Sequence, residues 1–478
     1  MLFERFEVPG LSHYSYAVGC PGVGKVAIVD PQRDVDIYLD FARAQGVEIA
    51  YILETHIHAD YASGARELAQ YTGAELMVSG YDKGELFEVA FRHRDLFEGN
   101  TVELGAVRIE ALHTPGHTPE HLSFLVYDGS RSREIPMLML TGDFLFVGSL
   151  GRPDLLGEEA KRGLAHELYK SAREKIAGLP DGLEIHPAHG AGSMCGSGMS
   201  GRSYSTLGFE RIANPYLAPL TEAAFVERIL ESVPPFPEYY KRMKLINSIG
   251  GLVFPQLPTP RGIDAETFRS LSEAGHIVLD VRDQHAYGTG HIGGSFAIGA
   301  GQDLSTWASW VVPYDVPLLL VGPDAAEVDA VVRSLVRVGL DDIRGYLQGG
   351  IAAWEKAGFD LTQTTTLAPE QVYELLAKDP SVQILDVRSE GEWDAGHLSE
   401  ALHIMGGELT ERLDELEGQE KAIACMCGTG YRSTVACSIL ERAGLTRLIN
   451  IAGGMRAWEA AGLPLEQSRQ GTAESALN

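Results

Sequence analysis

The sequence contains few cysteines, no long uninterrupted apolar stretch and no recognisable export signal. Five cysteines in 478 residues are too few for a disulfide scaffold. The most apolar stretch, residues 135–150, is interrupted by Asp143 and is too short to span a bilayer. The first ten residues lack the apolar core of a signal peptide. We therefore expect a reduced, cytoplasmic protein that does not enter a membrane.

The sequence also contains fewer basic than acidic residues. Lys and Arg number 39 against 66 Asp and Glu, which gives a formal charge of −27. This balance argues against nucleic-acid binding, because such surfaces need cationic side chains that displace phosphate counterions. Any anionic substrate must be held by local groups against the overall field. The length, with 45% hydrophobic and 22% charged residues, predicts about three globular domains.

The C-terminal half contains an internal duplication. Three landmarks recur in one order at a spacing of 104 to 106 residues. They are Asp280 and Asp386 within DVR, His291 and His397 within GHI or GHL, and Trp354 and Trp458 within AWE. Each copy opens with a buried-strand pattern and closes with a helix around its tryptophan. Strands that alternate with helices predict a parallel sheet covered on both faces.

Composition also divides the chain. Residues 254–262 are rich in proline, which is typical of a linker, and a short polar stretch separates the two repeats. The polar C-terminal end is expected to be disordered. The predicted segments are a first domain at 1–253, a linker at 254–262, repeats at 263–362 and 369–466 joined by a linker at 363–368, and a tail at 467–478.

Candidate metal ligands follow several predicted strands of the first domain. They are His56, His58 and Asp60 in THIHADY, His117 in TPGHT, Asp143 in TGD and His189 in PAHG. Loops at strand ends can bring such side chains to one edge of a sheet, as chelation requires. These four motifs, in this order, favour a metal site over a scatter of solvated histidines.

The arrangement resembles the metallo-β-lactamase fold, an αββα sandwich, over residues 1 to about 250. Within that superfamily it is similar to the persulfide dioxygenases and to the glyoxalase II hydrolases. Glyoxalase II enzymes hold two metals and continue the motif as HxHxDH, whereas the residue after Asp60 is Tyr61. Because tyrosine is a poor replacement for this ligand, we expect the second metal site to be incomplete.

The resemblance to persulfide dioxygenases implies one Fe(II) per chain, held by His56, His117 and Asp143, with zinc possible in purified protein. Two imidazoles and one carboxylate leave open positions for substrate and oxygen on non-haem Fe(II). His58, Asp60, Tyr61 and His189 are then expected near the metal, where they orient its ligands. The resemblance implies no cofactor other than this metal ion.

Three further features of the first domain lie close to the candidate ligand motifs in the sequence. Cys195, in a glycine-rich loop after the last histidine, is either an accessory thiol that handles sulfur or a small buried residue. Arg152 and Asp154 follow the Asp143 motif, and a loop salt bridge is favoured over a contact with an anionic product. His121, beside the PGH turn, is expected to be structural or exposed.

The second repeat contains a cysteine-centred loop. Its strand pattern ends between Cys425 and Cys427, and a helix is expected to start near Ser433. Between them lie Gly428, Thr429, Gly430, Tyr431 and Arg432. A thiol at the entrance to a helix, surrounded by backbone N–H groups, is nucleophilic, and Arg432 supplies positive charge for an attached anion. Cys425 points to the opposite strand face and is expected in the core.

This loop resembles the active loop of the rhodanese sulfurtransferases, and the DVR, GHL and GGMRAW motifs also match that family. The loop spans six residues from Cys427 to Arg432, one fewer than in phosphatases with a similar cradle. The shorter loop suits a sulfane sulfur better than a phosphate. The resemblance implies that Cys427 is the nucleophile and forms a persulfide.

The first repeat lacks this chemistry. Gap-free alignment places Gly322, Ala325 and Glu327 opposite Cys427, Gly430 and Arg432. The nucleophile is absent and the charge of the anion-binding position is reversed. We expect a rhodanese-like domain without sulfurtransferase activity, and three roles stay open for it: a spacer, a docking surface or a dimerisation element.

The complete pattern resembles bacterial persulfide dioxygenase–rhodanese fusions. That resemblance implies an α/β multidomain chain in which an αββα domain precedes two rhodanese-like domains with parallel sheets. It implies oxidation of a low-molecular-weight thiol persulfide by O2 to sulfite, coupled to sulfur transfer that makes or uses thiosulfate. The physiological role would be persulfide and sulfide detoxification. The carrier thiol and the direction of sulfur transfer stay open, and a homo-oligomer is possible.

Two other functions are compatible with part of the sequence pattern. The first is a binuclear zinc thioester hydrolase of the glyoxalase II type with a fused sulfurtransferase, against which Tyr61 and the fusion itself count. The second is a non-catalytic sulfur carrier with a structural metal, which the open His–His–Asp set disfavours because structural zinc sites are usually closed by four ligands.

Overall fold

The computed structural model describes residues 1–254, 256–322, 324–416 and 421–466; Pro255 of the predicted linker and the predicted tail lie outside these ranges. The chain forms two compact units. The first comprises Met1–Leu257 with Arg333–Gly339, and the second comprises Pro258–Val332 with the chain from Leu340 onward. In the described ranges, none of the helices is both long and apolar enough to cross a bilayer.

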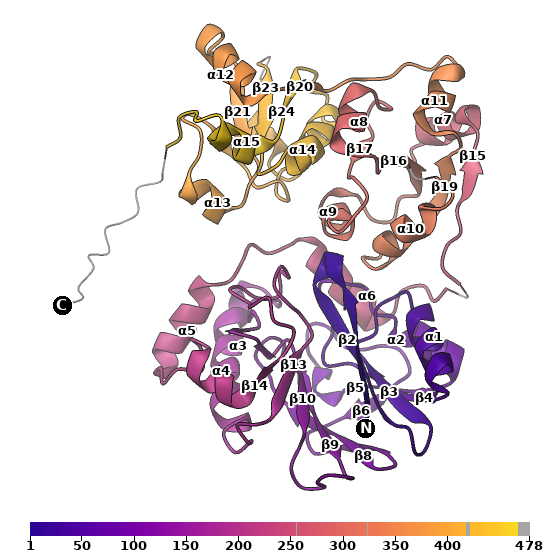
Figure 1. Ribbon diagram of the computed structural model, residues 1–478, viewed down its shortest axis with the longest axis vertical. Coiled ribbons are helices and arrows are strands. Elements are labelled where there is room, and N and C mark those ends of the chain that lie inside the picture. The colour runs from indigo at the N-terminus through magenta and orange to yellow at the C-terminus, as the bar shows by residue number, and fades with distance from the viewer. Residues whose placement is uncertain (255, 323, 417–420, 467–478) are drawn as a thin grey trace, which may run out of the picture. The chain divides into compact units, whose positions relative to one another are not determined.

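The first unit contains two six-stranded mixed sheets that pack face to face (Figure 1). The first sheet has the order β1 (Leu2–Val8), β2 (His13–Cys20), β3 (Lys25–Val29), β4 (Glu48–Leu53), β5 (Glu75–Ser79) and β6 (Arg94–Leu96). The second has the order β14 (Ser205–Thr206), β13 (Glu184–Pro187), β10 (Leu138–Gly142), β9 (Leu122–Asp128), β8 (Val107–His113) and β7 (Thr101–Leu104). A small hairpin joins β11 (Leu145–Phe146) to β12 (Ser149–Leu150).

Helices cover the outer face of each sheet (Figure 1). They are α1 (Asp36–Gln45), α2 (Ala65–Thr72), α3 (Glu158–Lys170), α4 (Leu207–Ala213), α5 (Glu222–Glu231) and α6 (Tyr239–Ile249). Because side chains alternate along a strand, Tyr16 and Val18 of β2 enter the core between the sheets, whereas Ala17 faces Tyr38 of α1 and Leu68 of α2. The αββα architecture predicted from the sequence is confirmed.

The second unit contains two five-stranded sheets with one topology, and all recorded strand pairs in them are parallel. The first has the order β15 (Arg261–Ile263), β19 (Ile343–Leu347), β18 (Leu318–Val321), β16 (Ile277–Asp280) and β17 (Phe296–Ala297). The second has the order β20 (Thr365–Leu367), β24 (Leu448–Ile451), β23 (Ile423–Met426), β21 (Gln383–Asp386) and β22 (Leu402–His403). The matching order confirms the duplication.

Helices accompany both parallel sheets. Those of the first repeat are α7 (Ala265–Glu273), α8 (Gln284–Thr289), α9 (Leu304–Val311), α10 (Val328–Val336) and α11 (Gly350–Lys356). Those of the second are α12 (Pro369–Lys378), α13 (Glu390–Ala395), α14 (Tyr431–Arg442) and α15 (Gly454–Ala460). Apolar side chains of helices and strands form a separate core in each repeat.

The repeated landmarks are structural in both copies. In the second copy, the Arg388 guanidinium is bidentate with Asp386, at 2.9 and 2.7 Å, and donates to the carbonyl of Gly396. The first copy repeats this geometry with its own DVR motif. The imidazole of His397 stacks on Trp393 with ring centroids 3.8 Å apart. The DVR and GHI or GHL motifs shared by the repeats therefore help to build the framework of each domain.

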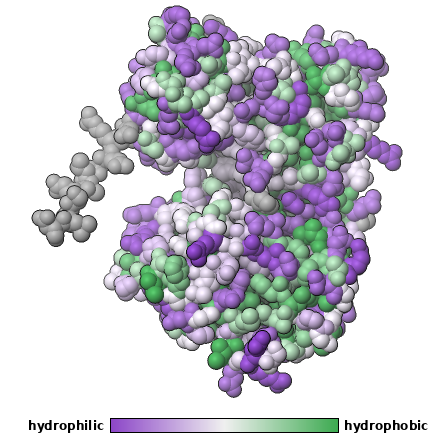
Figure 2. Space-filling view, in the orientation of Figure 1, coloured by the Kyte–Doolittle hydropathy of each residue, from purple (hydrophilic) through white to green (hydrophobic). Residues whose placement is uncertain are grey.

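The visible faces of both units carry hydrophilic side chains interspersed with hydrophobic ones (Figure 2). This mixture agrees with the acidic but otherwise ordinary composition of the chain. The chemistry-bearing side chains are buried rather than exposed, since His56, His117 and Asp143 are each at most 3% accessible.

Candidate metal centre and sulfur-transfer loop

The three predicted iron ligands converge inside the first unit. His56 follows β4, His117 follows β8 and Asp143 follows β10, and one ligand atom of each lies within 4.8 Å of the others. Asp143 Oδ2 is 3.9 Å from His56 Nε2 and 3.4 Å from His117 Nε2. Nε2 of His56, Nε2 of His117 and both carboxylate oxygens of Asp143 are buried without a hydrogen-bond partner among the described residues. Because buried polar atoms are normally partnered, this set is suited to a cation.

The backbone and neighbouring side chains orient both imidazoles. Nδ1 of His56 is hydrogen-bonded to the hydroxyl of Thr55 at 2.9 Å, and Nδ1 of His117 donates to the carbonyl of Arg152 at 2.9 Å. With Nδ1 engaged, Nε2 of each ring is directed toward the carboxylate. Metal-binding histidines are commonly held in this way through their second nitrogen.

The chain is tightly packed around Asp143. The backbone N–H of Asp143 donates a hydrogen bond to Nε2 of His121 at 3.0 Å. His121 is therefore a buried structural residue and not an exposed one. A Cβ on Gly151 would lie 1.9 Å from the carbonyl oxygen of Asp143, and this close approach requires glycine. Burial raises the pKa of Asp143 to about 6, and a bound cation would act in the opposite direction.

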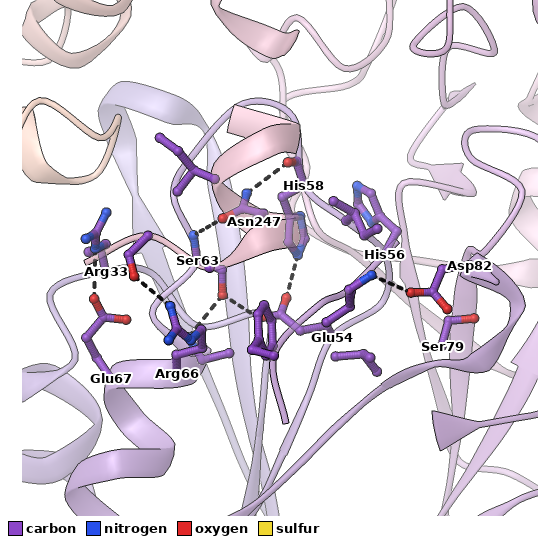
Figure 3. Close-up of a pocket in the computed structure, with 18 of the residues that line it drawn as sticks. Arg33, Glu54, His56, His58, Ser63, Arg66, Glu67, Ser79, Asp82 and Asn247 are labelled. Atoms are coloured by element: carbon purple, nitrogen blue, oxygen red, sulfur yellow. Dashed lines mark hydrogen bonds and ion pairs between the residues drawn. The ribbon is translucent and has the colours of Figure 1, made fainter. Parts of the chain in front are cut away.

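His58 lies beside His56, and its imidazole is directed at Glu54 (Figure 3). Its Nε2 is 2.9 Å from Glu54 Oε2 and 3.1 Å from Asp30 Oδ1. Burial acts to lower the pKa of His58, but these carboxylates outweigh it and raise the pKa well above its usual value. The two carboxylates and the imidazole form a buried polar network, which also includes Ser63 because its hydroxyl donates to Glu54. The sequence interpretation overlooked Glu54 and Asp30, although Glu54 lies only two residues before the first histidine of the HxHxD motif.

Tyr61 does not point into the centre. Its hydroxyl donates to the carbonyl of Asp30 at 3.2 Å, and its ring packs against His13 with centroids 4.0 Å apart. The sequence interpretation also overlooked His13, whose buried Nε2 has no hydrogen-bond partner among the described residues. No motif surrounds His13 in the sequence, so only the fold places it near His189, with ring centroids 5.5 Å apart.

Asp60, His189 and Cys195 form a separate group of potential ligands, again with one atom of each within 4.8 Å of the others. Cys195 is 1% accessible. Burial, together with the carboxylates of Asp60 and Asp143, raises the pKa of its thiol well above the usual value. From the sequence, Cys195 was expected beside the metal-binding loops, either as an accessory thiol or as a small buried residue. The structure places it beside these loops, close to Asp60 and His189.

Arg152 forms the loop salt bridge that the sequence favoured. Its guanidinium makes a bidentate pair with Asp154, at 2.7 Å for each bond. It also donates to the carbonyl oxygens of Met194 and Pro234, at 3.0 and 2.8 Å. Because these partners use both sides of the guanidinium, Arg152 fastens the loop that carries Cys195 and does not face a substrate.

The thiol of Cys427 lies at the predicted junction of strand, loop and helix. Its Sγ accepts a hydrogen bond from the N–H of Gly430 at 3.1 Å and lies 3.3 Å from the hydroxyl of Ser433. Gly430 has φ +98°, a conformation that favours glycine. The N–H of Met455, in the GGMRAW motif, donates to the carbonyl of Cys427 at 2.7 Å. The motif thus binds the carbonyls of Cys427 and Gly428, while the N–H of Gly430 is directed at the sulfur.

Helix α14 begins at Tyr431, two residues before the expected start, so Arg432 belongs to its first turn. The Arg432 guanidinium is bidentate with Glu392, at 2.7 and 2.6 Å. The sequence interpretation treated this charge as free for an anion and did not find Glu392. A signal existed, because Glu392 closes a capping box with Ser389 at the start of α13.

The first repeat contacts helix α14, which follows the Cys427 loop. The Tyr431 hydroxyl donates to the carbonyl of Gly299 at 3.2 Å, and His291 Nε2 is 3.0 Å from Glu441 Oε2. The N–H of Ala297 donates to a serine hydroxyl in the middle of α14 at 3.1 Å. Of the roles left open for this repeat, a mere spacer does not account for these contacts.

Fold and site together define a protein class: a buried metal-binding centre on an αββα scaffold, followed by one complete and one incomplete rhodanese-like site. Comparison with known proteins agrees. The chain matches the metallo-beta-lactamase superfamily over residues 8–189 and the rhodanese-like domain over residues 264–357 and 368–461. These matches confirm the three-part organisation and the resemblance stated from the sequence.

Three similar proteins match different shares of the chain. The structure of a metallo-beta-lactamase from Staphylococcus aureus subsp. aureus COL is 34% identical with a TM-score of 0.66, and the match covers 73% of this chain and 98% of that one. The mitochondrial persulfide dioxygenase ETHE1 of Bos taurus is 29% identical over 45% of this chain and 76% of its own length. Hydroxyacylglutathione hydrolase GloC of Haemophilus influenzae is 29% identical over 40% of this chain and 86% of its own length. The chain belongs to the metallo-beta-lactamase superfamily and carries two rhodanese-like domains.

Proposed function

We propose that the first unit is a non-haem Fe(II) persulfide dioxygenase and that the second repeat is a rhodanese sulfurtransferase coupled to it. The observation that carries the proposal is the buried set of His56, His117 and Asp143, whose facing atoms have no other partner among the described residues. The similarity to a persulfide dioxygenase over 76% of its length supports the choice of reaction.

The donor set fits iron. Two imidazole nitrogens and one carboxylate on one side of a metal are typical of non-haem Fe(II) oxygenases. Iron held there would supply adjacent open positions for a persulfide and O2. The overall reaction is RSSH + O2 + H2O → RSH + SO3²⁻ + 2H⁺, in which the outer sulfur is oxidised and O2 is reduced. The chain keeps both imidazoles aligned through Thr55 and the carbonyl of Arg152.

The second repeat would carry a sulfur atom on Cys427. In the step S2O3²⁻ + Cys–S⁻ → Cys–S–S⁻ + SO3²⁻, the thiolate attacks the outer sulfur, one S–S bond forms and the other breaks. The N–H of Gly430 donates to the attacking sulfur. Arg432 borders the loop, since one of its guanidinium nitrogens lies 3.0 Å from a Cβ built on Gly428. These groups support an anionic substrate despite the acidic chain.

The two activities share sulfite. Sulfite released in the first unit can accept the sulfur held on Cys427 and leave as thiosulfate. In the reverse direction, thiosulfate charges Cys427, and a small thiol then takes the sulfur as a persulfide. Either direction serves removal of persulfide or sulfide. We propose a cytoplasmic protein with small thiol persulfides, O2 and sulfite or thiosulfate as its reaction partners.

The deciding experiment is oxygen uptake by full-length protein loaded anaerobically with Fe(II) and given fresh glutathione persulfide. We expect rapid uptake with sulfite formation, and we expect both to vanish in His117→Ala. Cys427→Ser should abolish sulfur transfer from thiosulfate to cyanide and leave oxygen uptake intact. As a matched control, Cys437→Ala removes another buried thiol of the same repeat and should keep both activities.

Two results would overturn this account. Iron-loaded protein that consumes no oxygen with glutathione, coenzyme A or other small persulfides is not a persulfide dioxygenase. Oxygen uptake that stops in Cys427→Ser would contradict the assignment of two separate reaction sites.

A zinc-dependent thioester hydrolase is the second candidate, because the chain is equally similar to a hydroxyacylglutathione hydrolase. The position of Tyr61 counts against it, since its hydroxyl is engaged by the carbonyl of Asp30 rather than directed at the ligands. Zinc-loaded protein assayed with S-lactoylglutathione distinguishes the two functions. Thioester hydrolysis that exceeds oxygen uptake on a persulfide would favour the hydrolase.

A further inference from the structure

The two imidazoles of the proposed iron set belong to separate loops, and one ion pair joins these loops. Glu120 follows His117 in the loop between β8 and β9, and its Oε1 accepts a hydrogen bond from the N–H of Ile57 at 3.0 Å. Ile57 is the residue directly after His56. Lys244 of α6 donates from Nζ to the carbonyl of Ile57 at 2.8 Å. Its Nζ also lies 4.0 Å from Glu120 Oε1. The pair therefore engages both backbone polar groups of Ile57.

This ion pair is buried. Lys244 is 1% accessible and Glu120 is 4% accessible, so solvent has little access to either charge. A buried charge is costly unless it is paired and hydrogen-bonded, and the two side chains meet that condition through each other and through Ile57. Replacement of a buried ion pair by well-packed apolar side chains is often neutral or stabilising. Orientation of the loops therefore explains this pair better than stability of the fold does.

Helix α6 holds the loop that carries His58 at a second point. Asn247 lies three residues after Lys244, and residues at this spacing are neighbours on one face of a helix. Its Nδ2 donates to the carbonyls of His58 and Tyr61 at 2.9 and 2.7 Å. Its Oδ1 accepts a hydrogen bond from the N–H of Ser63 at 2.9 Å (Figure 3). One face of α6 thus fixes the backbone of the HxHxDY loop.

The bonds to Ile57 act on the direction of the neighbouring imidazole. Because a peptide unit is planar, the N–H of Ile57 lies in one plane with the carbonyl group of His56. The hydrogen bond to Glu120 therefore limits rotation of the backbone at His56. The bond from Lys244 fixes the next peptide unit in the same way. Groups that orient metal ligands contribute strongly to metal affinity although they do not touch the ion.

We propose that Lys244 and Glu120 are positioning residues of the metal centre. Their ion pair fixes the loops of His56 and His117 relative to each other and so strengthens binding of iron. The inference rests on the iron site of the proposed function, but it concerns affinity for the ion and not the reaction. The match to the metallo-beta-lactamase superfamily ends at residue 189, so Lys244 comes from a segment beyond that match.

The test is the affinity of the full-length protein for Fe²⁺, measured anaerobically by competition with a chromogenic chelator. Lys244→Met keeps a side chain of similar length but removes its charge and its bond to Ile57. We expect it to weaken binding of the iron that His117→Ala loses by roughly 10- to 100-fold, as for other residues that orient metal ligands. Lys241→Met changes an exposed lysine of the same helix. It is the matched control and should bind iron as the wild type does.

A double variant separates positioning from folding, because loss of one partner of a buried ion pair can itself destabilise the fold. Lys244→Met combined with Glu120→Gln leaves no unpaired charge and keeps an acceptor for the N–H of Ile57. We expect the metal-free double variant to unfold at nearly the wild-type temperature, while its iron affinity stays 10- to 100-fold lower. A purely structural role predicts instead that affinity returns together with stability.

Wild-type iron affinity in the double variant, or in a folded Lys244→Met protein, would overturn the proposal. Wild-type protein that binds no iron would overturn it together with the proposed function. Protein that binds iron with the expected differences between variants but consumes no oxygen would support the positioning role and contradict only the proposed reaction.

Discussion

The guanidinium of Arg432 and the carboxylate of Glu392 form a bidentate ion pair beside the Cys427 loop, with N–O distances of 2.7 and 2.6 Å. Burial acts to raise the pKa of Glu392, but the hydrogen bonds and charge of Arg432 outweigh it and lower the pKa to about 2. The pair is therefore ionised at neutral pH. Any anion on the loop shares the positive charge of Arg432 with this carboxylate.

Glu392→Gln is expected to strengthen binding of thiosulfate. The substitution removes the competing negative charge, while glutamine can still complete the capping box of α13. We expect the KM for thiosulfate to fall by roughly 3- to 10-fold, because Arg432 is released from its charge-assisted pair with Glu392 and can bind the anion. Steady-state sulfur transfer measures it, and Glu390→Gln, an exposed neighbour on the same helix, is the control. A rise in KM would mean that Glu392 chiefly orients Arg432.

Acidification should weaken the contact between the two repeats. Burial acts to raise the pKa of Glu441, but hydrogen bonds from His291 and the N–H of Gly294 outweigh it and lower the pKa. A carboxylate with a lowered pKa stabilises the folded state above the unfolded pKa of about 4.5. This contribution is lost as the pH falls through the folded value.

Glu441→Gln tests this contact. At pH 7 we expect a loss of about 1–3 kcal/mol in the free energy of unfolding, as for hydrogen bonds to charged groups. The difference from the wild type should start to shrink below about pH 4.5, because the carboxyl of the unfolded chain then becomes protonated, and it should vanish once the pH falls through the lower pKa of the folded state. Urea unfolding at several pH values measures it, with the exposed Glu459→Gln as control. A difference that is independent of pH would contradict the ion pair.

Removal of metal should destabilise the first unit selectively. A ligand that binds only the folded state at about 1,000 times its Kd contributes about 4 kcal/mol, which corresponds to roughly 8 °C or more in Tm for a domain of this size. We expect chelator-treated protein to show this decrease in calorimetry, and His117→Ala to respond less to chelation. Identical scans with and without chelator would argue against a buried metal.

Gly151→Ala should disrupt the metal centre through packing alone. Its Cβ would lie 1.9 Å from the carbonyl oxygen of Asp143 and 3.0 Å from Nδ1 of His117, so the loop must shift and displace two proposed ligands. Gly163→Ala is the matched control, because nothing lies within 4 Å of its Cβ. It should stabilise α3 by about 0.5–1 kcal/mol. Metal content of the two variants measures the effect, and normal metal content in Gly151→Ala would contradict this packing argument.

Sequence patterns determined the architecture of this protein. Short apolar stretches predicted several strands of the first unit, and the resemblance to the metallo-β-lactamase fold implied its two sheets. The spacing of Asp280, His291 and Trp354 with their counterparts predicted the duplicated parallel sheets. Such patterns are local: each depends on side chains within one strand, turn or helix. The resemblance to persulfide dioxygenases singled out His56, His117 and Asp143 as candidate ligands, and the structure brings one atom of each within 4.8 Å of the others.

Partners of those residues were decided only by the tertiary structure. Glu392 pairs with Arg432 across 40 residues of sequence, and His58 is turned from the centre by two carboxylates that no spacing rule connects to it. Likewise Cys195 meets Asp60 from a loop 135 residues further along the chain. The orientation of a buried side chain depends on which charges the fold brings within a few ångströms. The electrostatic energy between two charges depends on their distance in space. The sequence gives only their separation along the chain.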